Sequence, residues 1–199
     1  MHNRVVTFTG ADHIDDGAAF VRGTVDANLS QQKGFRGITV SADRAGGVFG
    51  VLTVWETEAD RDASEGTSAK MRDQGLEIIG GKMVVETFEE TVAEIKSPPV
   101  AGSPLTVTRI SMDPAKVDGN TAFFKSDVLP RIVASPGFCA VRHMINRQSG
   151  KGLVGTVWAS ETARATAADD AKSRRGEATE RGVTFDDITF REIIFADLR

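Results

Sequence analysis

Apolar side chains recur along the first half of the chain with two spacings, one typical of strands and one typical of helices. Phe20, Val21, Val25 and Leu29 fall on a single stripe of a helix. Elsewhere apolar residues alternate or run together, as they do in strands. Thr57, followed by acidic residues, is typical of the N-cap of a second, alanine-rich surface helix, and Ser160 is expected to have the same role in the second half of the chain. The predicted order is a strand over 4–9, a helix over 16–32, strands over 34–42 and 48–55, a helix over 59–74 and a strand over 82–92.

The second half of the chain repeats this pattern. Gly34-Phe35 recurs as Gly137-Phe138, and Thr53-Val54-Trp55 recurs as Thr156-Val157-Trp158, each 103 residues further on. So long a match without a gap favours a duplication over two unrelated strands rich in Val and Trp. Pro130 falls inside the first helix of this half and is expected to kink or shorten it. The predicted elements cover 105–112, 119–134, 137–146, 153–159, 162–181 and 184–195.

A proline-rich segment separates the two halves. Residues 96–104 hold three of the six prolines of the chain. Because proline lacks an amide donor and fixes φ, this segment reads as a linker. We therefore predict a first module over 1–95, a linker over 96–104 and a second module over 105–199. The order β-α-β-β-α-β in each module is the ferredoxin-like arrangement, which places the chain in the α+β class.

One face of each predicted sheet is too apolar to be left in water. Helices cover a single face of such a sheet, and the other carries parts of Ile38, Val40, Val51 and Val54. Two such sheets packed face to face bury both apolar surfaces. The tandem modules are therefore expected to pack sheet to sheet as a pseudo-dimeric α+β barrel within one chain. Association of two such chains into a homodimer is an open possibility.

Two short motifs occur in both modules. Ser135-Pro136-Gly137-Phe138 opens a predicted strand, and Gln32-Lys33-Gly34-Phe35 matches it without the proline. Trp55-Glu56-Thr57-Glu58 closes the next strand of the first module, with a weaker copy at Trp158-Ala159-Ser160-Glu161. Through these motifs nearly the whole chain resembles the antibiotic biosynthesis monooxygenase (ABM) superfamily of dimeric α+β barrels. The resemblance is more specific for fold than for function, because members range from enzymes to proteins without known activity.

The resemblance implies two kinds of chemistry, and the residues of this chain match the first only in part and the second not at all. Cofactor-free members oxygenate polycyclic phenols such as anthrones and have a tryptophan where Trp158 stands. They also use an asparagine four residues earlier and, in some, a tyrosine six residues later, where this chain has Val154 and Arg164. Haem-degrading members use an asparagine on the first strand and a Trp–His pair around the second helix. This chain has neither feature, so haem degradation is not expected.

The alternation of side chains along the strands places several candidate site residues on one face of the second module's sheet. If Asn146 pairs with Leu153, His143 lies opposite Thr156 and on the same face as Trp158. The first module has Val40 where the second has His143, so only the second places an imidazole on this face. Alternation adds further pocket-lining residues, namely Val141, Ile145, Val154 and Thr156 in the second module and Ile38, Val51 and Trp55 in the first.

These residues predict proton-transfer chemistry. A neutral His143 in an apolar pocket, with a pKa near 7, can take a phenolic proton, and the resulting anion can react with O2 without flavin or metal. Arg109, which the repeat aligns with Val6, is expected to steady that anion, or else to pair with Asp186 or Asp187. The alternative is that His143 and Trp158 are hydrogen-bonded or packed core residues.

Three functions follow for the chain. The first is a cofactor-independent monooxygenase of a small aromatic substrate, with His143, Trp158 and Arg109 as catalytic residues. The second is a binder of a small apolar ligand without chemistry, and the third is a structural or stress-associated protein. A cavity of roughly 300 Å³ or more that Trp158 and His143 line would favour the first two. The charged second helices, including Lys172-Ser173-Arg174-Arg175, are expected to be solvated faces.

The composition of the chain limits the classes of partner and the cellular compartment that we expect. The chain has 24 Lys and Arg against 28 Asp and Glu, a net charge of −4, and no basic run suited to nucleic acid. No apolar stretch approaches the roughly 20 residues of a membrane span, and no signal peptide is evident at the N-terminus. The single cysteine, Cys139, forms no intramolecular disulfide, and three scattered histidines do not suit a metal site. We expect a cytoplasmic protein with no cofactor and a small aromatic ligand.

Overall fold

The computed structural model describes residues 1–199, which divide into two compact units. Unit 1 consists of Met1–Phe88, Val100–Gly102 and Arg191–Arg199, and unit 2 consists of Glu89–Pro99 and Ser103–Phe190. Each unit thus takes most of its residues from one half of the chain and a strand segment from the other half.

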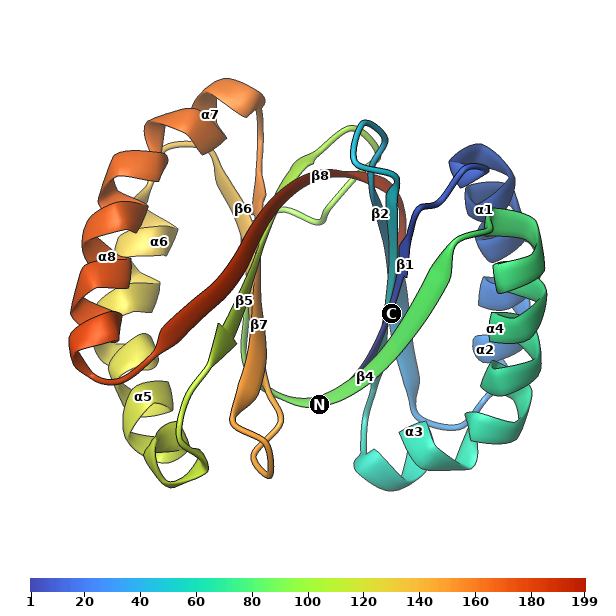
Figure 1. Ribbon diagram of the computed structural model, residues 1–199, viewed down its shortest axis with the longest axis horizontal. Helices are drawn as coiled ribbons and strands as arrows, with labels where there is room; N and C mark the ends of the chain where they lie inside the picture. Colours follow the sequence, from blue (N-terminus) through green and yellow to red (C-terminus); the bar gives the residue numbers. More distant parts are fainter. The chain divides into compact units, whose positions relative to one another are not determined.

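Unit 1 is a sheet with helices on one face. Its elements are β1 (His2–Thr9), α1 (Ile14–Phe20), the π-helical segment η1 (Val21–Val25), α2 (Asp26–Leu29), β2 (Phe35–Asp43), β3 (Val48–Trp55), α3 (Glu58–Ala63), α4 (Glu65–Ile79) and the first part of β4 (Lys82–Ile95). With the last part of β8 (Thr184–Leu198), the hydrogen-bonded order is β4-β1-β3-β2-β8. Helices α1, α2 and α4 lie along one face of this sheet (Figure 1).

Unit 2 has the same plan. Its elements are β5 (Pro104–Ser111), the 3-10 turn η2 (Pro114–Lys116), α5 (Val117–Phe123), the π-helical segment η3 (Phe124–Val128), α6 (Leu129–Ala134), β6 (Phe138–Ile145), β7 (Lys151–Trp158), α7 (Glu161–Thr166) and α8 (Ala168–Glu180). The first part of β8 and the last part of β4 complete the order β8-β5-β7-β6-β4. Helices α5, α6 and α8 cover one face (Figure 1). The predicted α+β class with two tandem ferredoxin-like modules is confirmed.

The strands β4 and β8 each run through both units. Residues 89–95 of β4 pair with β6 of unit 2, and residues 192–198 of β8 pair with β2 of unit 1. Each pairing contains a bulge, which leaves Thr91 in β4 and Ile194 in β8 as the extra residue. Both strands extend three residues beyond their predicted ends at 92 and 195, because this added pairing continues them.

Local signals placed the starts of the second helices correctly, whereas the predicted ends at 32 and 74 differ from the observed ends at Leu29 and Ile79. Thr57 and Ser160 are the N-caps, and their side chains accept hydrogen bonds from the amides of Asp60 and Ala163. Pro130 does not shorten its helix, which continues to Ala134. The π-helical segment before Pro130 recurs in unit 1, where the equivalent helix has no proline, so proline is not its cause.

The predicted hairpin register of unit 2 is wrong by two residues. His143 pairs with Val154, and Val141 pairs with Thr156. An even shift keeps every side chain on its predicted face of the sheet. His143 and Trp158 therefore still share a face.

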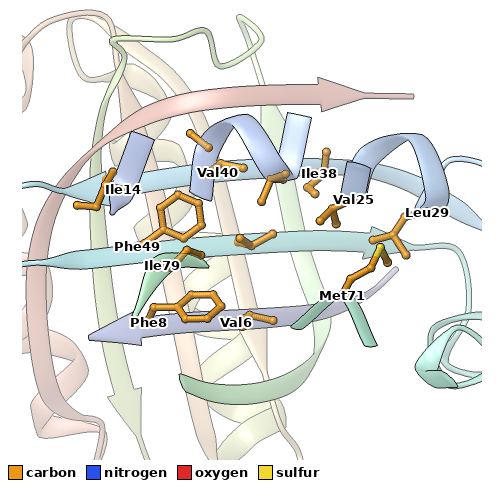
Figure 2. Close-up of a cluster of buried hydrophobic side chains, with 14 of the residues drawn as sticks. Val6, Phe8, Ile14, Val25, Leu29, Ile38, Val40, Phe49, Met71 and Ile79 are labelled. Atoms are coloured by element: carbon orange, nitrogen blue, oxygen red, sulfur yellow. The ribbon is translucent and has the colours of Figure 1, made fainter. Parts of the chain in front are cut away.

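A continuous apolar core fills the space between helices and sheet in unit 1. Figure 2 shows Phe8, Phe49 and Ile79 beside one another, with Ile14 and Val25 from the helical segments packed against the same strands. Phe49 and Ile79 are almost completely buried. Interdigitation of this kind leaves little room for a ligand.

Candidate functional site

A cavity of about 320 Å³ lies between the helices and the sheet of unit 2. The equivalent space in unit 1 measures about 50 Å³. A volume above 300 Å³ is in the range of small-molecule sites, whereas 50 Å³ is not. The lining of the unit 2 cavity is mainly apolar and aromatic. It includes Thr106, Thr108, Ile110, Phe123, Phe124, Val128, His143, Val154, Thr156, Trp158, Ala168, Ala171, Phe185 and Phe190.

His143 is held in place on the cavity wall by two contacts. Its Nδ1 atom lies 2.6 Å from Thr91 Oγ1, and the ring stacks on Phe124 with 4.4 Å between centroids. Thr91 is the bulged residue of β4, and the bulge lets its hydroxyl reach both the ring and, at 3.1 Å, the backbone oxygen of His143. The bulge therefore has a function in orienting the imidazole.

The hydrogen bonds of Thr91 favour one tautomer of His143. A threonine hydroxyl has a single proton to donate, and the His143 carbonyl oxygen can only accept it. When Thr91 donates to this carbonyl, Nδ1–H donates to Thr91 and Nε2 carries the lone pair. Nε2 has no hydrogen-bond partner in the protein, so this nitrogen is available as an acceptor.

Burial keeps the imidazole neutral. His143 is 3% exposed, and burial, with a smaller effect from the Lys125 charge, lowers its pKa from 6.5 to about 4. The expected value near 7 was therefore wrong, because the ring has no carboxylate beside it to favour the charged form. At neutral pH His143 accepts a proton only weakly.

Three guanidinium groups line the cavity along α7 and α8. Arg164 pairs with Glu161 and lies over the Phe190 ring, with its Cζ 4.1 Å from the centroid. Arg174 is buried and pairs with Asp170. Arg175 also lines the cavity, and no carboxylate pairs with it. The cavity lining contains no Asp or Glu.

The structure separates the predicted site residues into two groups. His143, Val154, Thr156 and Trp158 line the cavity together. Val141 and Ile145 are fully buried in the neighbouring core and do not line it. In unit 1, Val51 lines the small space, whereas Ile38 and Trp55 are packed core residues.

Arg109 lies away from this group. Thr108 and Ile110 on β5 line the cavity, so the intervening Arg109 points to the other face of the sheet. The alignment with Val6 was also wrong, because Thr108 pairs with Val154 as Val6 pairs with Val51. The duplicated strands are offset by 102 residues here, and this shift of one residue reverses the face.

Sequence reasoning missed Thr91 and the arginines of α8. Thr91 precedes the linker and so was assigned to the first module, although its strand segment belongs to unit 2. Lys172-Ser173-Arg174-Arg175 was predicted to be a solvated face, yet Arg174 is buried and Arg175 lines the cavity. One signal in the sequence pointed to burial, because the repeat aligns Arg174 with the apolar Met71 of the first module.

No group of three or more His, Cys, Asp or Glu side chains is placed to hold a metal ion. No helix is long and apolar enough to cross a membrane.

The chain is similar to two uncharacterised proteins of Mycobacterium tuberculosis strain H37Rv. It is 30% identical to Rv2557 over 140 residues, which are 70% of this chain and 62% of that protein. It is 26% identical to Rv2558 over 188 residues, which are 94% of this chain and 80% of that protein. The chain thus matches less than two thirds of the length of Rv2557. No family model matches the sequence.

Solved structures share the fold at low sequence identity. A proposed monooxygenase from Fusobacterium nucleatum superimposes with a TM-score of 0.75 at 11% identity, covering 100% of this chain and 94% of that one. An anthrone oxidase-like protein gives 0.70 at 14% identity, covering 99% and 93%. A ferredoxin-fold protein from Listeria monocytogenes related to antibiotic biosynthesis monooxygenases gives 0.55 at 13%, covering 96% and 94%. The chain has the fold of the ABM-like monooxygenases.

Proposed function

We propose that the chain is a cofactor-independent monooxygenase that acts on a small aromatic substrate in the cavity of unit 2. The observation that carries the proposal is a buried, neutral His143 with a free Nε2 on the wall of a cavity of about 320 Å³. The aromatic lining suits a flat substrate. The likeness to an anthrone oxidase-like protein supports the same chemistry.

The proposed reaction begins with proton transfer from the substrate to His143 Nε2. The substrate anion then gives an electron pair to O2 and forms a carbon–oxygen bond, and the peroxide takes the proton back from the imidazolium. Loss of water from the hydroperoxide leaves a carbonyl group. One oxygen atom enters the product, the other leaves as water, and the substrate supplies the electrons, so no external reductant is needed.

The low pKa of His143 restricts this reaction. A base whose conjugate acid has a pKa of about 4 cannot by itself ionise an ordinary phenol, whose pKa is near 10. The cavity must therefore stabilise the anion, and the guanidinium groups of Arg164 and Arg175 are the charges available for this role. Without that stabilisation the same cavity would bind an aromatic molecule and leave it unchanged, which is the second candidate function.

Oxygen consumption with an anthrone as substrate tests the proposal. We expect turnover by the wild-type chain and a loss of at least about 100-fold in His143→Ala, since a positioned general base contributes about that much or more. His13→Ala is the matched control and should retain full activity, because His13 lies on the surface of unit 1. Equal behaviour of the two variants would contradict the role of His143. Binding of the anthrone without oxygen uptake would favour the second candidate.

A further inference from the structure

The second helices of the two units are copies that differ where they face the sheet. Residues of α8 match residues of α4 at an offset of 103, with the N-caps Ser160 and Thr57 in step. In this alignment Arg175 corresponds to Arg72, and both arginines line the space beneath their helix. The two units therefore place the same guanidinium at the same site and can be compared directly.

In unit 1 this arginine is neutralised by the protein itself. Arg72 pairs with Glu65 of the same helix, and Glu65 also accepts an ion pair from Arg4 at 2.8 Å. Arg4 is buried beneath α4, where it also donates to the hydroxyls of Ser64 and Ser68 at 3.0 and 2.9 Å. The side chain of Arg4 thus occupies part of the space in unit 1, and the carboxylate of Glu65 neutralises both guanidinium groups.

In unit 2 both of these partners are missing. Ala168 replaces Glu65, and Thr106 replaces Arg4, since Thr106 pairs with Thr156 as Arg4 pairs with Thr53. Ala168 and Thr106 line the cavity that these replacements help to open. Arg175 keeps its position and has no carboxylate partner.

We propose that the ligand of the unit 2 cavity is an aromatic carboxylate whose acid group pairs with Arg175, in the role that Glu65 has toward Arg72. The inference rests on the proposed function only in taking the cavity as a ligand site. Oxygenation of the ligand is not required.

The charges around the cavity support an anionic ligand. Arg164 and Arg174 lie on the same wall as Arg175, and the lining supplies no acidic side chain. Burial lowers the pKa of Arg174 to about 10, and the nearby positive charges of Arg131 and Arg175 act in the same direction. A bound carboxylate would relieve this repulsion and form a charge-assisted pair. The remaining aromatic lining, including Phe124 and Trp158, would hold the ring system.

Binding of 2-naphthoate, compared with the neutral 2-naphthamide of nearly the same shape, tests the proposal by calorimetry on the full chain. We expect the carboxylate to bind about tenfold or more tightly than the amide, since the two have nearly the same shape and only the carboxylate forms an ion pair with a guanidinium. Equal affinities would overturn the proposal.

Two variants test the residues named. Arg175→Gln should remove the preference for naphthoate over naphthamide. Ala168→Glu supplies the acid that unit 1 already has and should reduce naphthoate affinity by about tenfold or more, because the new carboxylate occupies Arg175. Lys172→Gln is the matched control on α8, because Lys172 is exposed and does not line the cavity. It makes the same change of charge and should bind naphthoate as the wild type does.

The outcomes separate this inference from the proposed function. Naphthoate binding that needs Arg175, in a chain that consumes no oxygen with any aromatic tested, supports the inference and contradicts the monooxygenase. Anthrone oxidation that is lost in His143→Ala, in a chain that binds naphthoate and naphthamide with equal affinity, contradicts the inference alone. If the Ala168→Glu variant does not fold, the preference of Arg175→Gln for naphthoate over naphthamide decides whether the inference holds.

Discussion

At the scale of single residues, two substitutions between the copies give unit 2 a polar pair that unit 1 lacks. His143 and Thr91 take the positions that Val40 and Ile194 hold in unit 1, at equivalent points of equivalent strand pairs. Val40 is part of the apolar core, and Ile194 packs against it. The bulge lies at the equivalent point of the strand pairing in both units. The pair of His143 and Thr91 therefore results from exchanges of side chains at equivalent backbone positions.

The lowered pKa of His143 predicts a pH-dependent stability. Its pKa is about 4 when folded and 6.5 as the reference value, so the unfolded chain binds more protons between these limits. The favourable contribution is fully present above pH 6.5 and is lost as the pH falls toward 4, at most about 3 kcal/mol in all. Urea unfolding at pH 7, 5.5 and 4.5 measures this loss.

The double variant His143→Val/Thr91→Ile restores the unit 1 pair and serves as the comparison. It should lose less stability than the wild type over the same pH range, because the titrating group is gone and both replacements are apolar. Parallel stability curves for the two proteins would show that His143 is not the group responsible.

At the scale of elements, the hairpin turns of the two copies share a conformation and differ in crowding. Gly47 and Gly150 both have positive φ, at +60° and +68°. Ala11 N donates a hydrogen bond to Gly47 O, and Met112 N donates one to Gly150 O, at 2.9 and 3.0 Å. A Cβ at Gly47 would lie 3.5 Å from its nearest neighbour, whereas at Gly150 it would lie 1.9 Å from Met112 O.

We expect Gly150→Ala to cost more stability than Gly47→Ala. Both variants carry the left-handed backbone penalty of about 1 kcal/mol. Gly150→Ala adds a clash with backbone that cannot move aside cheaply, for a total of about 3 kcal/mol or more. Thermal unfolding of the two variants measures the difference, and equal melting temperatures would contradict it.

Elements were predictable from the sequence where the cause of each is local. The N-cap at Ser160 and the strand alternation around His143 depend on neighbouring residues, so order and facing were correct. The position of Arg109 required an offset that changes by one residue between the strands, and the repeat alone does not reveal this. The volume of the cavity was not predictable, because it depends on side chains from several elements, such as Thr106 of unit 2 where unit 1 has Arg4.

At the scale of the whole molecule, the duplication has let the two units diverge in packing. The main core cluster of unit 1 contains 17 buried residues, whereas unit 2 has separate clusters of 7 and 5. Helix α4 buries Ser68, Met71, Gly75 and Ile79, and α8 buries only Arg174. A helix that covers a cavity contributes less apolar burial than one packed on a filled core. Unit 1 thus has one large apolar core cluster, whereas unit 2 keeps a cavity between its helices and its sheet.

This difference in packing predicts unequal local stability. Amides in the middle of α8 should exchange with solvent about tenfold faster than those of α4, because opening α8 exposes less apolar surface. Hydrogen exchange followed by mass spectrometry of the full chain measures both helices in one sample. Saturating 2-naphthoate should slow exchange in α8 and leave α4 unchanged, since mass action stabilises only the states that bind the ligand. Equal exchange in the two helices without ligand would show that the cavity does not weaken its cover, and protection of α4 by naphthoate would place the ligand in unit 1.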